Sequence, residues 1–143
     1  MKTIVTLLLL TLPLFGARKT IVPPEFAATA ATAPYSPGIL VDGTLYVSGT
    51  VGQDIKTSQI PAEFEQEVKV CLDRIGLVLK AAGMTFADVV NVQVYLTDMS
   101  LFPRMNAVYT SVFKSPRPAR TTVGVTALAA SAAHIEIAVT ARK

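Results

Sequence analysis

Arg120 and Glu136 are the two residues of this sequence whose types and positions best suit chemistry on a small acid. Arg120 begins a β-branched segment directly after a Pro-rich turn, and Glu136 lies between Ile135 and Ile137 in another. A guanidinium can bind a carboxylate through two parallel hydrogen bonds, and a nearby carboxylate can orient or deprotonate a water molecule. The pair therefore predicts a site for a small carboxylic acid. The alternative is an exposed cross-strand ion pair, which would contribute little.

Other familiar catalytic motifs are missing from the sequence. It has no Gly-rich phosphate loop and no Ser-His-Asp set in a recognisable frame. With His134 and Cys71 as its only histidine and cysteine, it can form neither an internal disulfide nor a Cys/His metal site. We interpret His134 as a surface or edge residue. Cys71 falls in a helical apolar pattern, which indicates a small core residue.

The length and charge of the sequence indicate a single domain and argue against a nucleic-acid-binding protein. The 143 residues suffice for one domain, and a domain of this size gains from an oligomer that buries one more face. The net charge of +3 is mild and the sequence contains no basic run. Because nucleic-acid binding usually requires clustered Lys and Arg, we expect no nucleic-acid partner.

The N-terminus resembles a secretory leader. Met1-Lys2 supplies a positive start, and Ile4 to Phe15 is an almost unbroken apolar run followed by Gly16 and Ala17. The run is too short to span a bilayer but suits the central region of a signal peptide. We predict a signal peptide over residues 1–17 and a domain over 18–143, hence a periplasmic or secreted protein that leaves the membrane after cleavage. An uncleaved anchor or a buried first strand is the alternative, and without a functional leader the protein would be cytoplasmic.

The first half of the predicted domain reads as strands, a hairpin and a helix. Lys19–Val22 is β-branched, Ala27–Ala33 reads as a loop, and Asp42-Gly43 between two apolar runs predicts a type I′ hairpin. Alternation would place Leu45, Val47 and Val51 on one face of the second hairpin strand, with Tyr46, Ser48 and Thr50 on the other. A helix is predicted over 63–82 from apolar residues at steps of three and four. Glu63, Glu65 and Glu67 crowd its first turns, where the helix dipole favours negative charge.

The second half predicts a strand, a second helix and two final strands. Residues 88–96 alternate, with Val90, Val92, Val94 and Leu96 assigned inward, and Asp98 or Ser100 can cap a helix that runs to Phe113. Strands over 119–126 and 133–141 complete an α+β fold with two helices on one face of a mixed sheet. If these two strands pair, Val123 faces the core and Arg120 and Glu136 emerge on the same side. The opposite, polar sheet face is either solvated or a subunit interface.

Six segments occur together in an order that resembles the RidA (YjgF-type) family. They are Lys19–Val22, Ala33–Gly38, Leu45–Gly49, Arg104–Tyr109, Pro118–Val123 and Ala133–Ile137. The resemblance covers Arg18 to Lys143. It implies a chorismate-mutase-like fold and a homotrimer whose sheets form a central barrel, with sites in clefts between subunits. It also implies hydrolysis of 2-imino and enamine acids to 2-keto acids and ammonia, with no cofactor or metal.

The resemblance also assigns roles to residues. Arg120 matches the arginine that binds the substrate carboxylate, and Glu136 matches the acid that positions water. The other matching positions line the cleft and are Tyr35, Ser48, Gly49, Phe102, Asn106 and Thr122. Thr122 stands where many relatives carry a Cys, so thiol chemistry is excluded there. Two alternatives stay open: a non-catalytic module outside the cytoplasm that binds small carboxylates, and, with least support, an endoribonuclease or translation inhibitor.

Overall fold

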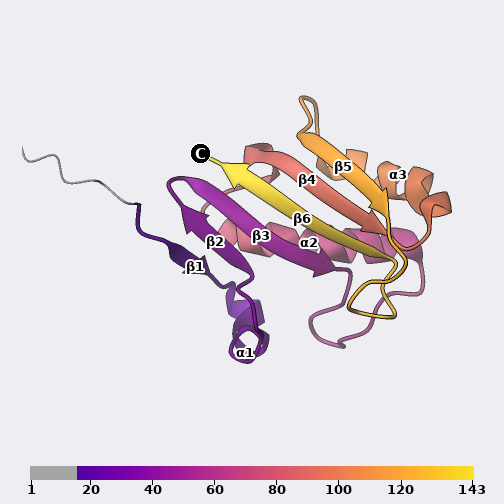
Figure 1. The fold of residues 1–143 in the computed structure, drawn as a ribbon, viewed down its shortest axis with the longest axis horizontal. Helices are drawn as coiled ribbons and strands as arrows, with labels where there is room; N and C mark the ends of the chain where they lie inside the picture. The colour runs from indigo at the N-terminus through magenta and orange to yellow at the C-terminus, as the bar shows by residue number, and fades with distance from the viewer. Residues whose placement is uncertain (1–15) are drawn as a thin grey trace, which may run out of the picture.

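The computed structural model describes residues 16–143 and shows a six-stranded mixed sheet with helices behind one face (Figure 1). The strands are β1 (Lys19–Ile21), β2 (Gly38–Val41), β3 (Thr44–Val51), β4 (Val89–Leu96), β5 (Ala119–Gly124) and β6 (Ile135–Arg142). The helices are α1 (Ala27–Ala30), α2 (Phe64–Ala81) and α3 (Phe102–Val112). The predicted leader, residues 1–17, lies almost entirely outside the described residues. From residue 16 onward, no helix has both the length and the apolar composition needed to cross a membrane.

The sheet has the order β1-β2-β3-β6-β4-β5, with only β4 and β5 parallel. The core lies between this sheet and α2, whose residues Val68, Cys71 and Ile75 are fully buried. In Figure 1, α2 and α3 lie behind the sheet and the other face is open. The α+β prediction is therefore confirmed. The loop predicted for Ala27–Ala33 is partly wrong, because a 3-10 turn over Pro24–Phe26 leads directly into the short helix α1.

The predicted hairpin forms between β2 and β3. Asp42 and Gly43 have φ angles of 49° and 73°, as a two-residue type I′ turn requires. The pairing places Val41 opposite Thr44 and Gly38 opposite Val47. Because β2 begins at Gly38, no strand formed by residues 16–143 lies beside Ser48 to Val51 on that side of β3.

Two β-bulges interrupt the predicted strand alternation. On β3, Val47 lies opposite Val139 and Thr50 lies opposite Ile137, so β3 carries one extra residue between them. A bulge of this kind reverses the faces of the residues that follow it. Val51 consequently lies opposite Glu136, and the prediction that it shares a face with Leu45 and Val47 is wrong.

The second bulge lies at the start of β4. Val89 pairs with Ala141 and Asn91 with Thr140, which leaves Val90 as the extra residue. Val90 is 50% exposed. The prediction that it points inward is therefore wrong, whereas Val92, Val94 and Leu96 are buried as expected.

The final two strands do not pair, because β4 lies between β5 and β6. Arg120 is aligned with Val92, a buried residue on the helix-covered face, whereas Glu136 is aligned with Tyr95 on the open face. Val123, also aligned with Tyr95, is 40% exposed rather than in the core. The prediction that Arg120 and Glu136 emerge on the same side of the sheet is therefore wrong.

Candidate functional site

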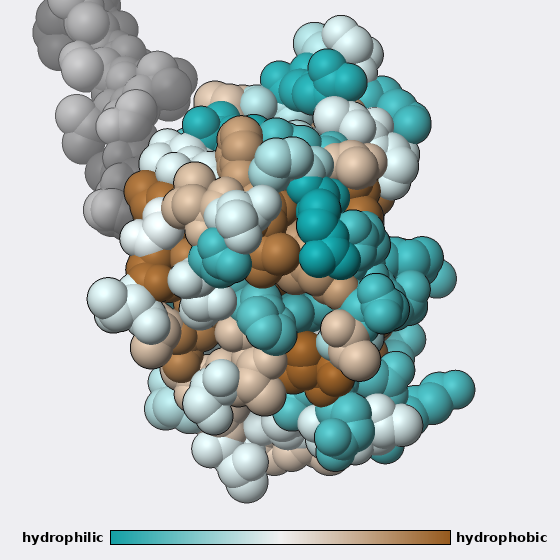
Figure 2. All heavy atoms as spheres, turned by 90° about the vertical axis from the view of Figure 1, so that its right-hand side faces the viewer, coloured by the Kyte–Doolittle hydropathy of each residue, from teal (hydrophilic) through white to brown (hydrophobic). Residues whose placement is uncertain are grey.

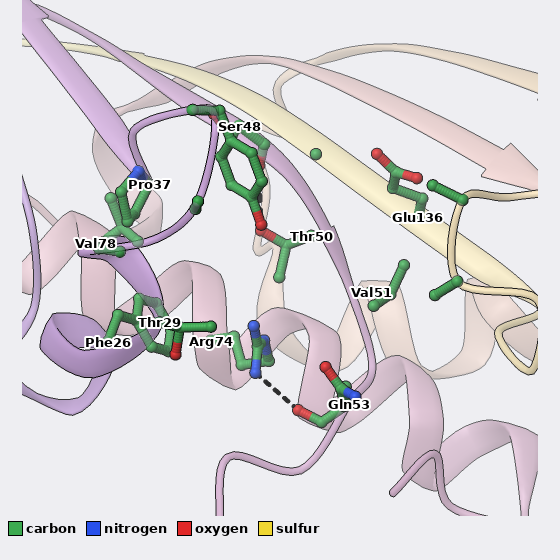
Figure 3. A pocket seen from close by; sticks show the side chains of 16 residues that line it. Phe26, Thr29, Pro37, Ser48, Thr50, Val51, Gln53, Arg74, Val78 and Glu136 are labelled. Atoms are coloured by element: carbon green, nitrogen blue, oxygen red, sulfur yellow. Dashed lines mark hydrogen bonds between the residues drawn. The ribbon is translucent and has the colours of Figure 1, made fainter. Parts of the chain in front are cut away.

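A cavity of about 400 Å³ lies beside the uncovered edge of β3. Its walls come from the α1 segment, the Ser48–Val51 part of β3, α2, the loop at Ala129–Ala130 and β6. Figure 3 shows Glu136 on β6 and Arg74 on α2 at different sides of this hollow, with Thr50 and Val51 between them. Cavities of this size commonly bind small molecules. We call it the Glu136 cavity.

Gly49 allows the Glu136 carboxylate to lie against the β3 bulge. A Cβ atom built at Gly49 would lie 1.9 Å from Oε1 of Glu136, so a side chain there would displace the carboxylate. Glu136 is half-buried and, among residues 16–143, is the only acidic residue that lines the cavity. The bulge thus places a carboxylate where it can contact a bound molecule.

Ser48 supports the cavity wall through hydrogen bonds. Its hydroxyl donates to the carbonyl oxygen of Ser36 over 2.7 Å, and its backbone N–H donates to the carbonyl of Pro37 over 3.1 Å. These bonds fix the segment that carries Tyr35, which lines the cavity and is 58% exposed. The structure thus gives the Ser48 hydroxyl a supporting contact and leaves the Tyr35 ring accessible.

Arg120 lies in a separate groove between β5 and α3. Its Nη1 donates to Oδ1 of Asn106 over 2.9 Å, and its guanidinium carbon lies 4.5 Å from the Tyr109 ring centroid and 5.5 Å from that of Phe102. Within residues 16–143 it forms no ion pair with a carboxylate. The alternative of an Arg120–Glu136 ion pair is therefore wrong. We call this the Arg120 groove; Figure 2 views the molecule from the β5–α3 side and shows hydrophobic residues interspersed with hydrophilic ones there.

Two buried hydroxyl groups accompany Arg120. The Tyr109 hydroxyl and Thr122 Oγ1 have no hydrogen-bond partner among the described residues. Burial raises the pKa of Tyr109, and the Arg120 and Arg117 charges offset part of that increase. Buried hydroxyls without partners are uncommon in proteins, so these two groups next to Arg120 have unused hydrogen-bonding capacity.

The predicted site residues thus fall into two groups. Tyr35, Ser48, Gly49 and Glu136 surround the Glu136 cavity, whereas Phe102, Asn106, Arg120 and Thr122 belong to the helix-covered side near α3. Strand β4 separates Glu136 on β6 from Arg120 on β5, and these two residues lie on opposite faces of the sheet. One chain alone therefore does not bring Arg120 and Glu136 into a common site.

Sequence reasoning missed a buried carboxylate. Glu67 is 0% exposed and accepts hydrogen bonds from the backbone N–H groups of His134 (2.7 Å) and Ile135 (3.3 Å). Its Oε2 also lies 2.9 Å from Nδ1 of the half-exposed His134 ring. The interpretation of Glu67 as one of the acids that favour the helix dipole overlooked its position. It lies three residues after Phe64 and four before Cys71, within the apolar stripe of α2.

Arg74 was also missed, although its position carried a signal. It lies three residues after Cys71 and four before Val78, at the margin of the apolar stripe, and it is half-buried in the cavity wall. Cys71 itself is confirmed as a core residue, since it is fully buried and its thiol donates to the carbonyl of Thr50 over 2.9 Å. Burial raises the pKa of this thiol far above its ordinary value. Across the described part of the chain, no cluster of three or more His, Cys, Asp or Glu residues could hold a metal ion.

The structure is an α+β domain with helices on one face of a mixed sheet, a cavity at a β-bulge and a separate arginine groove. The family model described as Endoribonuclease L-PSP matches residues 26–143. The 2-iminobutanoate/2-iminopropanoate deaminase of Bos taurus is 44% identical over 102 residues, which cover 71% of this chain and 74% of the bovine protein. The chain therefore belongs to the RidA family, whose model carries the Endoribonuclease L-PSP description.

Other relatives agree with this placement. A RutC family protein of Sulfurisphaera tokodaii is 41% identical over 81% of this chain and 93% of its own length. The crystal structure of the YjgF gene product of E. coli has a TM-score of 0.78 at 31% identity, covering 87% of this chain and 98% of that one. That of E. coli TdcF with bound serine has a TM-score of 0.75 at 26% identity, over 80% and 91% of the two chains.

Proposed function

We propose that this protein hydrolyses 2-imino acids and their enamine tautomers to 2-keto acids and ammonia, without a cofactor. The observation that carries the proposal is the state of Arg120. Its guanidinium is held by Asn106 and two aromatic rings, and no described carboxylate neutralises it. Because these contacts already hold the guanidinium in place, it can bind the carboxylate of a small acid with little further loss of side-chain entropy. The deaminase names of relatives at 41–44% identity support the reaction class.

The proposed site lies between chains. Because Arg120 and Glu136 face opposite sides of the sheet, we propose a homotrimer in which the Arg120 groove of one subunit meets the Glu136 cavity of another. The open sheet face, with Tyr46 53% exposed and Gln93 also exposed, supports a buried role in such an assembly. In the homotrimer that the family resemblance implies, these open faces would form the central barrel.

The proposed chemistry needs positioning more than covalent catalysis. Arg120 holds the substrate carboxylate, and Glu136 accepts a hydrogen bond from a water molecule that attacks the imine carbon. As the new C–O bond forms, the C=N π electrons move to nitrogen, and one proton of the water passes by way of Glu136 to that nitrogen, which gives a neutral carbinolamine. The hydroxyl proton of the carbinolamine then moves to the nitrogen as the C–N bond breaks, so that ammonia leaves and the keto C=O bond forms. Imines of this kind also hydrolyse unaided, so correct placement of water and substrate can supply the acceleration.

The decisive experiment measures keto-acid and ammonia release from imino acids made in situ by an amino-acid oxidase. We expect the parent protein to accelerate release and Arg120→Ala to lose at least about a hundredfold in kcat/KM, because the substrate carboxylate loses its main partner. Arg104→Gln, an exposed arginine paired with Glu65, is the matched control and should behave like the parent. An Arg120→Ala protein as active as the parent would remove the basis of the proposal.

The same experiment distinguishes the deaminase from a binding module, and the charge distribution argues against an endoribonuclease. A module that only binds carboxylates would retain 2-keto acid affinity but show no turnover with any imine. The support for an endoribonuclease comes from two names. They are the description of the family model and the name of a Thermotoga maritima protein whose crystal structure is similar at 35% identity. Against it, Arg104 and Lys69 are neutralised by Glu65 and Asp73 rather than forming a basic stripe.

We also propose that the leader exports this protein to the periplasm or the medium. The apolar run from Ile4 to Phe15 and the small residues Gly16 and Ala17 support cleavage after Ala17. N-terminal sequencing of the protein from its native host, combined with cell fractionation, tests this directly. A cytoplasmic protein that still begins at Met1 would contradict it.

A further inference from the structure

We propose that Arg74 forms a second anion-binding point, and that this protein prefers 2-imino acids whose side chain carries a carboxylate. The inference rests on the proposed function, because it names the substrate class of that site. It begins from the charges in the Glu136 cavity. Among the residues that line the cavity, Arg74 is the only cation and Glu136 the only acid.

Arg74 forms no salt bridge with a described carboxylate, and the charge of Asp54 acts on it only from beyond salt-bridge distance. Its Nη1 donates to the carbonyl oxygen of Gln53 over 2.8 Å, and its guanidinium carbon lies 4.9 Å from the Phe26 ring centroid. Its Nε is buried and has no hydrogen-bond partner. Because a guanidinium carries five N–H donors and stays charged, most of its binding capacity is unused.

The environment of Arg74 makes an anionic ligand favourable. A half-buried charge is costly unless it is paired, and burial lowers the pKa of Arg74 for that reason. The contact with Phe26 and the bond to Gln53 hold the side chain in place at the cavity wall. A ligand carboxylate would supply the missing partner without requiring the arginine to reorganise.

Position decides which part of the ligand Arg74 would bind. Figure 3 places Arg74 at the α2 side and Glu136 at the β6 side of the cavity, so an anion at Arg74 avoids the Glu136 carboxylate. In the proposed cleft, Arg120 takes the carboxylate that all 2-imino acids share. Arg74 is then left for a group at the far end of the substrate, and the volume of about 400 Å³ exceeds what a three- or four-carbon acid needs. These features favour dicarboxylic imino acids, such as those formed when acidic amino acids are oxidised.

The test compares two imines made in situ, one from glutamate and one from 2-aminobutyrate. For the parent protein we expect kcat/KM to be higher for the glutamate-derived imine. Arg74→Gln should lower the ratio of the two values by about tenfold or more, and Arg74→Lys should recover part of it because it restores the charge. Arg104→Gln, an exposed arginine outside the cavity, is the matched control and should leave the ratio unchanged.

Calorimetry with the products separates this inference from the proposed function. We expect 2-oxoglutarate to bind the parent more tightly than 2-oxobutanoate, and Arg74→Gln to lose that difference while unfolding at a temperature that shows an intact fold. If the parent turns over both imines equally and Arg74→Gln weakens both alike, the role of Arg74 is overturned and the deaminase function stands. If the folded parent turns over neither imine, the deaminase function fails, and the difference in product binding alone decides whether Arg74 binds an anion.

Discussion

At the scale of single residues, Arg104 differs from Arg120 and Arg74 in the partners that its guanidinium contacts. Arg104 donates two hydrogen bonds to the exposed Glu65 carboxylate, at 2.7 and 2.6 Å. Arg120 and Arg74 instead contact a side-chain amide, a backbone carbonyl and aromatic rings, none of which neutralises their charge. Arg120 and Arg74 also line hollows, whereas Arg104 lies on the surface. An anionic ligand bound in either hollow could form an ion pair with the guanidinium that has no carboxylate partner.

The Arg104–Glu65 pair predicts a specific pH dependence. The hydrogen bonds from Arg104 hold the pKa of Glu65 at about 2, below its ordinary value of 4.5. A lowered folded-state pKa stabilises the fold fully above pH 4.5, and that contribution is lost as the pH falls through about 2. We expect the difference in melting temperature between the parent and Arg104→Gln to be small, constant above pH 4.5, and absent near pH 2. A carbon-13 titration of Glu65 that is the same in both proteins would contradict this.

The buried Glu67 predicts a larger effect on stability. Replacing it with Ala leaves the backbone N–H groups of His134 and Ile135 buried without an acceptor. We expect Glu67→Ala to lower the free energy of unfolding by about 3 kcal/mol, and Glu67→Gln, which keeps an acceptor oxygen, by about 1 kcal/mol. Urea denaturation measures both, with the exposed Glu25→Gln as control. Equal stability of the Ala variant and the control would show that these hydrogen bonds contribute nothing.

At the scale of elements, the β3 bulge is the feature that creates the cavity site. It reverses the faces of the residues that follow it, so that Val51 lies opposite Glu136. It also places Gly49 next to the Glu136 carboxylate. The end of β2 opposite Val47 leaves the same stretch of β3 uncovered. A short partner strand and one extra residue together give a ligand access to the sheet edge.

Gly49→Ala tests the importance of this close approach. The added methyl group would meet Oε1 of Glu136, the movable end of a flexible side chain, so the fold should survive while the carboxylate shifts. We expect kcat to fall about tenfold or more with little change in melting temperature, because a small displacement of a positioning group is costly for catalysis. Gly76→Ala, which adds a methyl group on α2 next to Phe86, is the control and should keep full activity. Full activity in Gly49→Ala would mean that the position of Glu136 is not critical.

At the scale of the whole molecule, the two halves of the proposed site cannot meet within one chain. Arg120 lies on the helix-covered face of β5, and Glu136 lies on the open face of β6. Figure 1 shows β4 between these two strands. A subunit assembly that joins them would make activity depend on association. It would also bury part of the polar open face.

Mixed assemblies give a direct test of a shared site. Arg120→Ala and Glu136→Gln proteins should each be inactive, but chains refolded together should regain activity, because about a quarter of the sites in random trimers combine an intact Arg120 with an intact Glu136. The measurement is deaminase activity of the mixture against each variant refolded alone, with the mass of the assembly determined by light scattering. No recovery in a mixture that forms trimers would show that Arg120 and Glu136 of different subunits do not form a shared site.

The sequence alone determined the local structure and the residues worth testing. The spacing of Phe64, Val68 and Cys71 predicted α2, and Asp42-Gly43 predicted the hairpin turn that the structure contains. Such patterns are local, since they reflect which side of one element is apolar and which residues tolerate positive φ. The motifs around Arg120 and Glu136 likewise identified the family that the comparisons confirm.

Only the tertiary structure decided how those residues are arranged. The sequence order suggested that β5 and β6 are neighbours, but β4 lies between them. The register of each strand with β4 places Arg120 and Glu136 on opposite faces. The alternation of side chains did not indicate the bulges at Val90 and after Val47. The burial of Glu67 and Arg74 was indicated only by their positions within and beside the apolar stripe of α2. The physical reason is that strand neighbours and register depend on which distant segments bury the most apolar surface together, and a periodic pattern within one segment carries no record of its partner.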